Sequence, residues 1–162
     1  MSAAVSIGFL ADAPRHTGTL AGWHHAEWAS LYTDWTHDVA EAELADHATR
    51  RTLPTTLIAT EAGMLIGSVS LVSVDAAELA HFGDHWLASL YVLPAHRRRK
   101  LGAMLVGALV AHAAGQGVET LRLFTTHHAD YYRQFGWQLQ TQADLNGTTV
   151  SVMSIQPRRV LS

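Results

Sequence analysis

The chain has 162 residues, of which 48% are hydrophobic and 15% are charged, and its formal net charge at pH 7 is −3. This length suits a single domain, and the composition excludes a disordered chain. The absence of cysteine excludes disulfides, thiolate zinc sites and thiol nucleophiles. Because the net charge is negative, a nucleic-acid partner would need a local basic surface.

The first fifty residues are predicted to form a strand and two helices. Val5 to Leu10 has the composition of a short strand, and apolar residues then recur at helical spacing between Thr17 and Tyr32. Thr36 is predicted to cap a second helix that runs through Arg50, because acidic residues follow it in the first turns.

Three strands are predicted in the middle of the chain. Thr55 to Thr60 and Met64 to Val72 are separated by Glu-Ala-Gly, which predicts an antiparallel hairpin. Trp86 to Leu93 is almost continuously apolar, as in a strand that is buried on both faces. We therefore expect this third strand at the centre of a sheet.

A helix, a strand and a second, shorter helix follow. Leu101 to Gln116 is rich in Ala, Leu and Val and ends at glycines, which predicts a helix. Val118 to Thr125 has strand character, and a right-handed crossover would place it parallel to the central strand. His127 to Phe135 is predicted to form the short helix, which Gly136 ends.

The last predicted elements form a hairpin around an Asn146-Gly147 turn, with strands at Trp137 to Gln142 and Thr148 to Ile155. No repeat or linker divides the chain, so we expect one mixed α/β domain over residues 1–162. The exposed edge of this hairpin would accept a second subunit in a homodimer. No apolar run approaches the ~20 residues that span a bilayer, which predicts a cytoplasmic protein without a membrane partner.

A basic run, Arg97-Arg98-Arg99-Lys100, lies between the predicted central strand and the helix that follows it. The first amides of a helix have no partner within the helix, and together with the helix dipole they attract phosphate. Gly102 would let a ligand approach the backbone closely. A solvated basic face or a nucleic-acid patch would have the same composition, but the position at a helix start favours a phosphate site.

This run resembles the acetyl-CoA signature of the GNAT superfamily of N-acetyltransferases. That signature is usually Arg/Gln-x-x-Gly-x-Gly/Ala after Val-x-Pro. Here Val92-x-Pro94 is followed by Arg97-x-x-Lys100-x-Gly102. The one departure is Lys100, which stands where the first glycine is usual.

A second segment, from Thr125 to Trp137, is also similar to the family, in which a tyrosine lies four residues before a glycine and an aromatic residue. Tyr132 and Gly136-Trp137 occupy these places. Two motifs in this order, joined by a helix and a strand, are far more specific than either motif alone. The resemblance is good from Leu57 to Ile155 and weak before it.

The resemblance implies the α/β GNAT fold, a mixed and mostly antiparallel sheet of about seven strands with a parallel central pair and helices on both faces. It implies acetyl transfer from acetyl-CoA directly to a primary amine, without a metal. The acceptor would be a small amine or a peptide or protein N-terminus, with no nucleic-acid partner. The cofactor-binding residues that it implies are Leu90, Tyr91, Val92, Arg97, Arg98, Arg99, Lys100, Leu101, Gly102, Ala103, Met104 and His127.

The resemblance also gives Tyr132 the role of general acid. A phenol of pKa ~10 stays protonated at neutral pH and can donate its proton to a leaving thiolate, although a packed aromatic residue would look the same in the sequence. Asp84 and His85, just before the central strand, are the candidates for the base, with capping or surface roles as the alternative. The preceding connection contains Asp75, Glu78 and His81 and is expected to border the acceptor cleft.

Two other functions are consistent with the same residues. A CoA-binding regulatory module would keep the phosphate site but not the general acid. A nucleic-acid-binding domain would use Arg97 to Lys100 and would bind with a steep dependence on salt. The eleven histidines show no zinc-ligand spacing, so no metal site is predicted.

Overall fold

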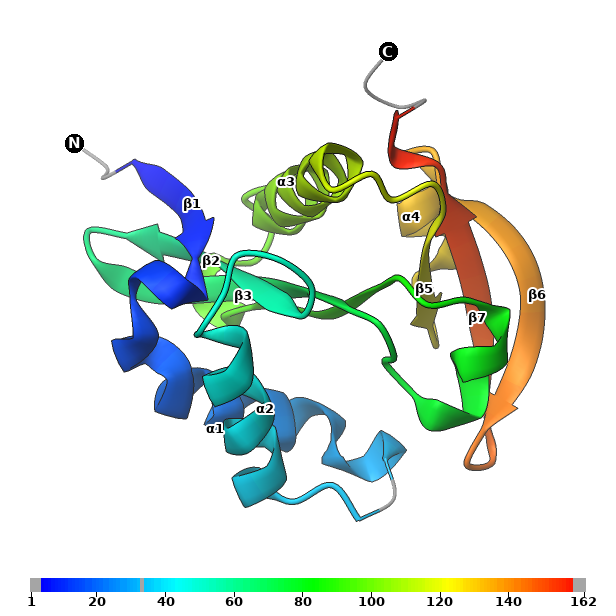
Figure 1. Cartoon of the computed structure of the whole chain (residues 1–162), viewed down its shortest axis with the longest axis horizontal. Coiled ribbons are helices and arrows are strands. Elements are labelled where there is room, and N and C mark those ends of the chain that lie inside the picture. The colour runs from blue at the N-terminus through cyan, green and yellow to red at the C-terminus, as the bar shows by residue number, and fades with distance from the viewer. Residues whose placement is uncertain (1–3, 33, 159–162) are drawn as a thin grey trace.

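The computed structural model describes residues 4–32 and 34–158. The chain forms a seven-stranded sheet in the order β1-β2-β3-β4-β5-β7-β6, with α1 and α2 on one face and α3 on the other (Figure 1). Among the described strands only β4 and β5 pair in parallel, which confirms the predicted mixed sheet with one parallel central pair. The strands are β1 (Val5–Phe9), β2 (Thr55–Glu61), β3 (Met64–Val72), β4 (Trp86–Val92), β5 (Leu121–Thr125), β6 (Gln138–Leu145) and β7 (Thr148–Ile155). The helices are α1 (Thr17–Trp28), α2 (His37–His47), α3 (Leu101–Gly115) and α4 (Ala129–Arg133).

The described residues form three hydrophobic cores, and the sheet separates two of them, as β2 shows. Successive side chains of a strand point to opposite faces. Leu57 and Ala59 belong to the core that contains the buried face of α3, whereas Ile58 packs with residues of α1 and α2. The alternation in β2 therefore places α1 and α3 on opposite sides of the sheet.

Both predicted hairpins are confirmed, and their turns need left-handed backbone. Asn146 and Gly147 have φ values of 50° and 88°, and Ala62 and Gly63 have values of 53° and 78°. Two consecutive positive φ angles are the geometry of the tight turn that matches the twist of antiparallel strands. β6 is longer than the predicted strand and forms one edge of the sheet.

The predicted helices are confirmed with shorter bounds. The hydroxyl of Thr36 accepts a hydrogen bond from the amide of Val39 at 3.2 Å, as expected of the residue that caps α2. α1 ends at Trp28 and continues as a short 3₁₀ segment, Ala29–Leu31. Among residues 4–32 and 34–158, no helix is long and apolar enough to cross a membrane.

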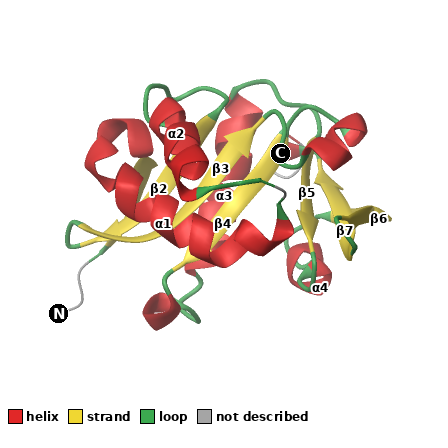
Figure 2. Ribbon diagram, turned by 90° about the horizontal axis from the view of Figure 1, so that it is seen from below, coloured by secondary structure: helices red, strands yellow, loops and turns green. Residues whose placement is uncertain are grey.

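The central position of β4 is confirmed, but its burial on both faces holds only for its first half. Trp86 and Leu87 are 1% and 3% exposed, whereas the strand is half-buried from Ser89 onward. β4 pairs with β5 in register only between Trp86 and Arg122, and the two strands then diverge (Figure 2). The expectation of burial was wrong for the second half because β5 no longer pairs with it there, although β3 still covers its other edge.

Candidate active site

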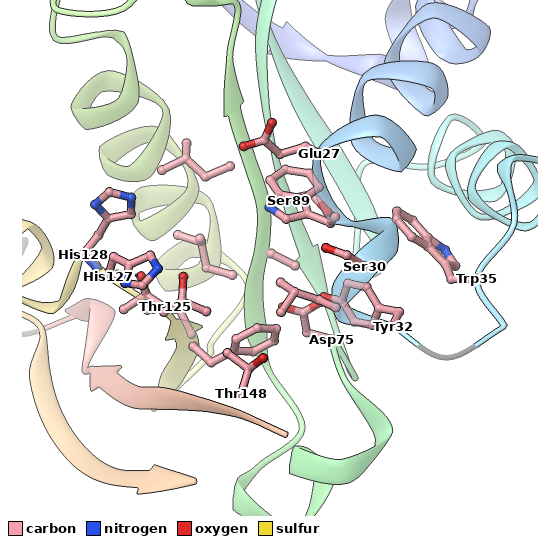
Figure 3. A pocket seen from close by; sticks show the side chains of 18 of the residues that line it. Glu27, Ser30, Tyr32, Trp35, Asp75, Ser89, Thr125, His127, His128 and Thr148 are labelled. Atoms are coloured by element: carbon pink, nitrogen blue, oxygen red, sulfur yellow. Dashed lines mark hydrogen bonds between the residues drawn. The ribbon is translucent and has the colours of Figure 1, made fainter. Parts of the chain in front are cut away.

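Two cavities lie along the second half of β4, where it leaves β5. The first, here called the basic cavity, has a volume of about 560 Å³ and lies between β4 and the start of α3. The second, the acidic cavity, has about 580 Å³ and lies between β4, β5 and the segment after α1 (Figure 3). Both volumes are in the range of small-molecule sites. The cavities share four lining residues, Glu27, Leu90, His128 and Tyr132.

The basic cavity brings together most of the residues expected to hold the cofactor. Those that line it are Leu90, Tyr91, Val92, Arg97, Arg98, Lys100, Leu101 and Gly102. The other four expected residues are not among its described lining. Arg99 instead pairs with Glu61, and His127 lines the acidic cavity. Ala103 and Met104 lie further along α3, where Met104 is 42% exposed.

The loop before α3 has an unusual backbone that explains why a glycine is common in it. Arg98 and Lys100 have φ values of 68° and 64°, in the left-handed region that costs an L-residue about 1–2 kcal/mol but costs glycine almost nothing. Lys100 caps α3, and its carbonyl accepts the amide of Met104 at 3.1 Å. The amides of residues 101–103 therefore precede the first bond of the helix and are free for an anion.

Arg97 is held against the strand that forms the other wall of the basic cavity. Its Nε donates a hydrogen bond to the carbonyl of Val92 at 2.9 Å, and its guanidinium lies 5.8 Å from the ring centroid of Tyr91. A guanidinium is well suited to phosphate because it offers several donors in a planar fork. Arginine, lysine and helix amides together fit a polyphosphate ligand in this cavity.

The acidic cavity has the opposite charge. Its lining includes Glu27, Glu43 and Asp75, and no lysine or arginine occurs among its described lining residues. The hydroxyl of Tyr32 donates a hydrogen bond to Oδ1 of Asp75 at 2.8 Å. These carboxylates make the cavity a favourable place for a cation.

Burial changes the protonation of the groups in the acidic cavity. It raises the pKa of Asp75 to about 7, against the opposing effect of the bond from Tyr32. It also raises the pKa of Tyr32, so that this phenol stays a donor, and it raises the pKa of Glu43. The charge of Asp75 is therefore sensitive to pH near neutrality.

Tyr132 lies where the two cavities meet. It is 8% exposed, and its ring packs against Tyr131 and Trp137 at centroid distances of 5.3 Å and 6.0 Å. Burial raises the pKa of Tyr132, with a smaller contribution from Tyr131. The phenol is therefore protonated at neutral pH, and Tyr132 lines both cavities.

A bulge turns β4 at the entrance to both cavities. Ser68 of β3 pairs with Tyr91, and Ser70 pairs with Ala88, so β4 has one residue more than β3 over this stretch. Ser89, within the bulge, has a φ of 56°. Ser89 lines the acidic cavity, and Leu90 after it lines both.

The structure does not bring the two expected bases into this site. Asp84 and His85 contact each other at 3.1 Å, the side chain of Asp84 is 90% exposed, and neither is among the described residues that line the cavities. Of the connection expected to border the acceptor cleft, Asp75 lines the acidic cavity, whereas Glu78 and His81 are not among its described lining residues. Glu27 was missed because its position in α1 resembles any exposed helical site until the fold places it beside β4 (Figure 3).

Comparisons with known proteins agree with the geometry. Residues 20–137 match the family model described as "Acetyltransferase (GNAT) family", so the match begins earlier in the chain than the sequence motifs. A sequence search of curated proteins found no match.

Several solved structures are similar over nearly the whole chain. An aminoglycoside 6′-N-acetyltransferase complexed with coenzyme A has 14% identity and a TM-score of 0.71, covering 94% of this chain and 97% of that chain. The acetyltransferase yncA from Salmonella typhimurium, with its cofactor acetyl-CoA, has 17% identity and a TM-score of 0.70, covering 95% and 94%. A chimera of the spermidine N-acetyltransferase SpeG from Vibrio cholerae and hSSAT has 15% identity and a TM-score of 0.66, covering 98% of both chains. At these identities the likeness is one of fold.

Proposed function

The chain belongs to the GNAT acetyltransferase family, and we propose that it transfers the acetyl group of acetyl-CoA to a small, positively charged primary amine. The observation that carries this proposal is the meeting of two cavities of opposite charge at Tyr132 and Glu27. A polyanionic donor suits the basic cavity and a cationic acceptor suits the acidic one, so the two reactants would meet at the shared wall.

The basic cavity is the proposed site of coenzyme A. The amides at the start of α3, with Arg97, Arg98 and Lys100, would hold its pyrophosphate. The backbone of Leu90 to Val92 lines the same cavity beyond the last register pair with β5, so it has the free edge that a pantetheine chain would follow. When bound, acetyl-CoA would supply an acetyl thioester for attack by the neutral amine; as a C–N bond replaces the C–S bond, the nitrogen would lose a proton and the thiolate would gain one.

Tyr132 is the proposed general acid. Its phenol lies at the junction, and the raised pKa keeps the proton on the hydroxyl at neutral pH. A thiolate, whose thiol has a pKa of about 8.5, is a weaker base than a phenolate. Transfer of the proton from the phenol of Tyr132 to the thiolate is therefore uphill and needs a favourable geometry at the moment of transfer. The enclosed position of Tyr132 supports that geometry.

Glu27 is the proposed proton acceptor, in place of Asp84 and His85. An alkyl ammonium of pKa about 10.4 is mostly charged at pH 7 and must lose a proton before its nitrogen can attack. Glu27 is the one carboxylate in the shared lining among the described residues, so it can receive that proton directly or through water. Asp75 and Glu43 lie only in the acidic cavity, where they would hold the acceptor.

The proposal is tested by calorimetric titration with acetyl-CoA, followed by assay of a panel of acceptors. The panel contains a hydroxylated monoamine with one positive charge, a diamine, a triamine, a zwitterionic amino acid and a tripeptide with a free N-terminus. We expect micromolar binding of acetyl-CoA and the highest kcat/KM for the diamine or triamine. Preference for the tripeptide would contradict the small-amine proposal, and no acetyl-CoA binding by the folded protein would contradict the donor. Salt-dependent nucleic-acid binding that acetyl-CoA does not displace would then favour the nucleic-acid alternative.

The acid role predicts a large effect of Tyr132→Phe on turnover. We expect kcat to fall by about 100-fold, with the Kd for acetyl-CoA nearly unchanged, because a general acid typically contributes a factor of about 10²–10⁴. Tyr131→Phe is the matched control, since Tyr131 lines only the basic cavity. Equal turnover of Tyr132→Phe and the native protein would exclude the acid role. If the native protein bound acetyl-CoA but acetylated no acceptor, a regulatory CoA-binding function would be favoured instead.

A further inference from the structure

A buried polar chain lies behind the wall of both cavities. Nε2 of His24, on α1, is 2.8 Å from the hydroxyl of Ser68 on β3. That hydroxyl donates a hydrogen bond to the carbonyl of Ser89 in the bulge of β4, at 3.1 Å. His24 and Ser68 are 2% and 0% exposed, and neither is among the described residues that line the cavities.

The number of protons in this chain fixes its direction. A hydroxyl has one proton, and Ser68 uses it toward the carbonyl of Ser89, which can only accept. The bond between Ser68 and His24 must then be donated by Nε2–H of the imidazole. Burial lowers the pKa of His24 to about 3, with a smaller effect from His47, so the ring is neutral and has a single N–H. Each donor is thus matched to one acceptor.

The end of this chain is the strained residue of the bulge. Ser89 has a left-handed φ of 56°, which costs a non-glycine residue about 1–2 kcal/mol. Such a conformation persists only where its surroundings determine it. The hydrogen bond from Ser68 holds the carbonyl of Ser89. On the other side of Leu90, β3 approaches β4 so closely at Gly67 that a Cβ there would lie 2.8 Å from the carbonyl of Tyr91. β3 therefore contacts β4 on both sides of Leu90.

His24 also supports an aromatic wall of each cavity. Its ring centroid lies 5.1 Å from that of Trp28, which lines the acidic cavity. It lies 6.4 Å from that of Tyr91, which lines the basic cavity. The same imidazole thus contacts both walls and, through Ser68, fixes the bulge between them.

We propose that His24 and Ser68 are positioning residues, which hold the Ser89 bulge so that the backbone of Leu90 has the correct direction at the junction of the two cavities. They touch neither reactant. Their effect on turnover rests on the proposed acetyl transfer, whereas their effect on the backbone of β4 does not. Loss of the chain would let the bulge relax and would misplace the shared wall, and a misplacement of about 1 Å can reduce a rate by about 100-fold.

Ser68→Ala and Ser70→Ala form a matched pair for the test. Both serines are on β3 and are buried, at 0% and 1% exposure. Among the described residues, the hydroxyl of Ser70 bonds to that of Thr56 at 2.7 Å and not to β4, so Ser70→Ala removes the same group without releasing the bulge. We expect both variants to lose thermal stability to a similar extent.

The kinetic result should separate the two variants. We expect Ser68→Ala to lower kcat by about 10- to 100-fold with little change in the Kd for acetyl-CoA, because the phosphate-binding groups lie elsewhere, at residues 97–102. Ser70→Ala should keep nearly the native kcat. His24→Ala should behave like Ser68→Ala, and His24→Gln should recover part of the loss because its amide can donate in place of Nε2–H. Equal kcat in Ser68→Ala and Ser70→Ala would overturn the proposal.

A second readout works without turnover. In ¹⁵N-labelled protein, Ser68→Ala should shift the backbone amide resonances of Ser89 and Leu90, and Ser70→Ala should shift them much less. If the native protein proved inactive with every acceptor, the proposed function would fail while this comparison still decided the role of Ser68. Unchanged resonances of Ser89 and Leu90 in folded Ser68→Ala would overturn the positioning role, whatever the activity.

Discussion

The basic and acidic cavities share a wall but are assembled in different ways. The basic cavity takes most of its lining from one continuous stretch, residues 90–102. The acidic cavity takes its lining from segments as distant as Glu27, Asp75 and Thr148. A site made by neighbours in the sequence is visible as a motif, whereas a site made by distant segments is visible only after folding. The comparison also separates the two proposed functions, because binding of the donor would depend on local backbone and choice of acceptor would depend on scattered side chains.

The largest effect should come from closing the basic cavity, with Gly102→Val. A Cβ at Gly102 would lie 3.0 Å from the hydroxyl of Tyr131, so a larger side chain occupies the space at the start of α3 and displaces a wall of the cavity. We expect the Kd for acetyl-CoA to rise by about 100-fold or more, which corresponds to about 2.8 kcal/mol. Isothermal titration calorimetry measures this change.

Gly107→Val is the control for this substitution. Gly107 is an exposed residue of the same helix, and a Cβ there would have no heavy atom within 4 Å. Both variants change helix propensity in the same way, so only the effect on the cavity differs. Native affinity in Gly102→Val would mean that the ligand does not approach the start of α3, and the assignment of the basic cavity would fail.

A smaller effect is expected in the acidic cavity, where two carboxylates should act on different kinetic constants. Glu27→Gln should lower kcat by about 10- to 100-fold because it removes the proposed proton acceptor at the junction. Asp75→Asn should instead raise KM for the amine by about 10-fold, as expected for the loss of one charged contact worth about 1.4 kcal/mol. Asp38→Asn, an exposed position on α2 outside the described linings, controls for the change in net charge. If the two active-site variants had the same effect on kcat and KM, the division of roles would be wrong.

The raised pKa of Asp75 gives the same prediction a pH dependence. The carboxyl becomes charged as the pH rises through about 7, so KM for a cationic amine should fall between about pH 6 and pH 8, and Asp75→Asn should remove this slope.

The same raised pKa predicts that Asp75 contributes less to the free energy of unfolding at higher pH. The native state binds this proton more tightly than the unfolded chain, whose Asp pKa is about 3.9, so the contribution of Asp75 to the unfolding free energy decreases as the pH rises from about 4 to about 7. Denaturant titrations of the native protein and Asp75→Asn at several pH values measure this difference.

Much of the fold could be predicted from sequence because its signals are local. The Asn146-Gly147 turn, the cap at Thr36 and the apolar run of β4 each depend on residues close together in the chain. The basic cavity was predictable for the same reason. The error in this prediction comes from a contact between residues distant in the sequence. Arg99 was grouped with its basic neighbours, but Glu61, distant in the sequence, attracts its guanidinium away from the cavity lining.

Apart from Asp75, the acidic cavity could not be predicted, and neither could the bulge, because nothing in a single segment specifies them. Position 89 is a serine and not the glycine that would indicate a left-handed φ. Its conformation depends on Ser68 of another strand. Glu27 becomes a junction residue only when α1 packs beside β4. The divergence of β4 from β5 also has no pattern in the apolar run, which is why its second half was expected to be buried.

The smallest predicted effect tests the one departure of the basic cavity from its family motif. Lys100 holds a left-handed φ of 64° that glycine adopts almost without cost, so Lys100→Gly should raise the unfolding free energy relative to Lys100→Ala by about 1 kcal/mol. For a chain of this size, that difference corresponds to about 2–4 °C in Tm. Both variants remove the same ammonium, so the difference between them isolates the backbone, and thermal denaturation without ligand measures it. A higher Tm for Lys100→Ala would show that the loop is not strained at this residue.

If Lys100→Gly and Lys100→Ala weakened acetyl-CoA binding equally, the lysine would contribute its charge to the basic cavity. If only Lys100→Ala weakened it, the backbone would be the part that matters, in keeping with a cavity built from one continuous stretch of chain.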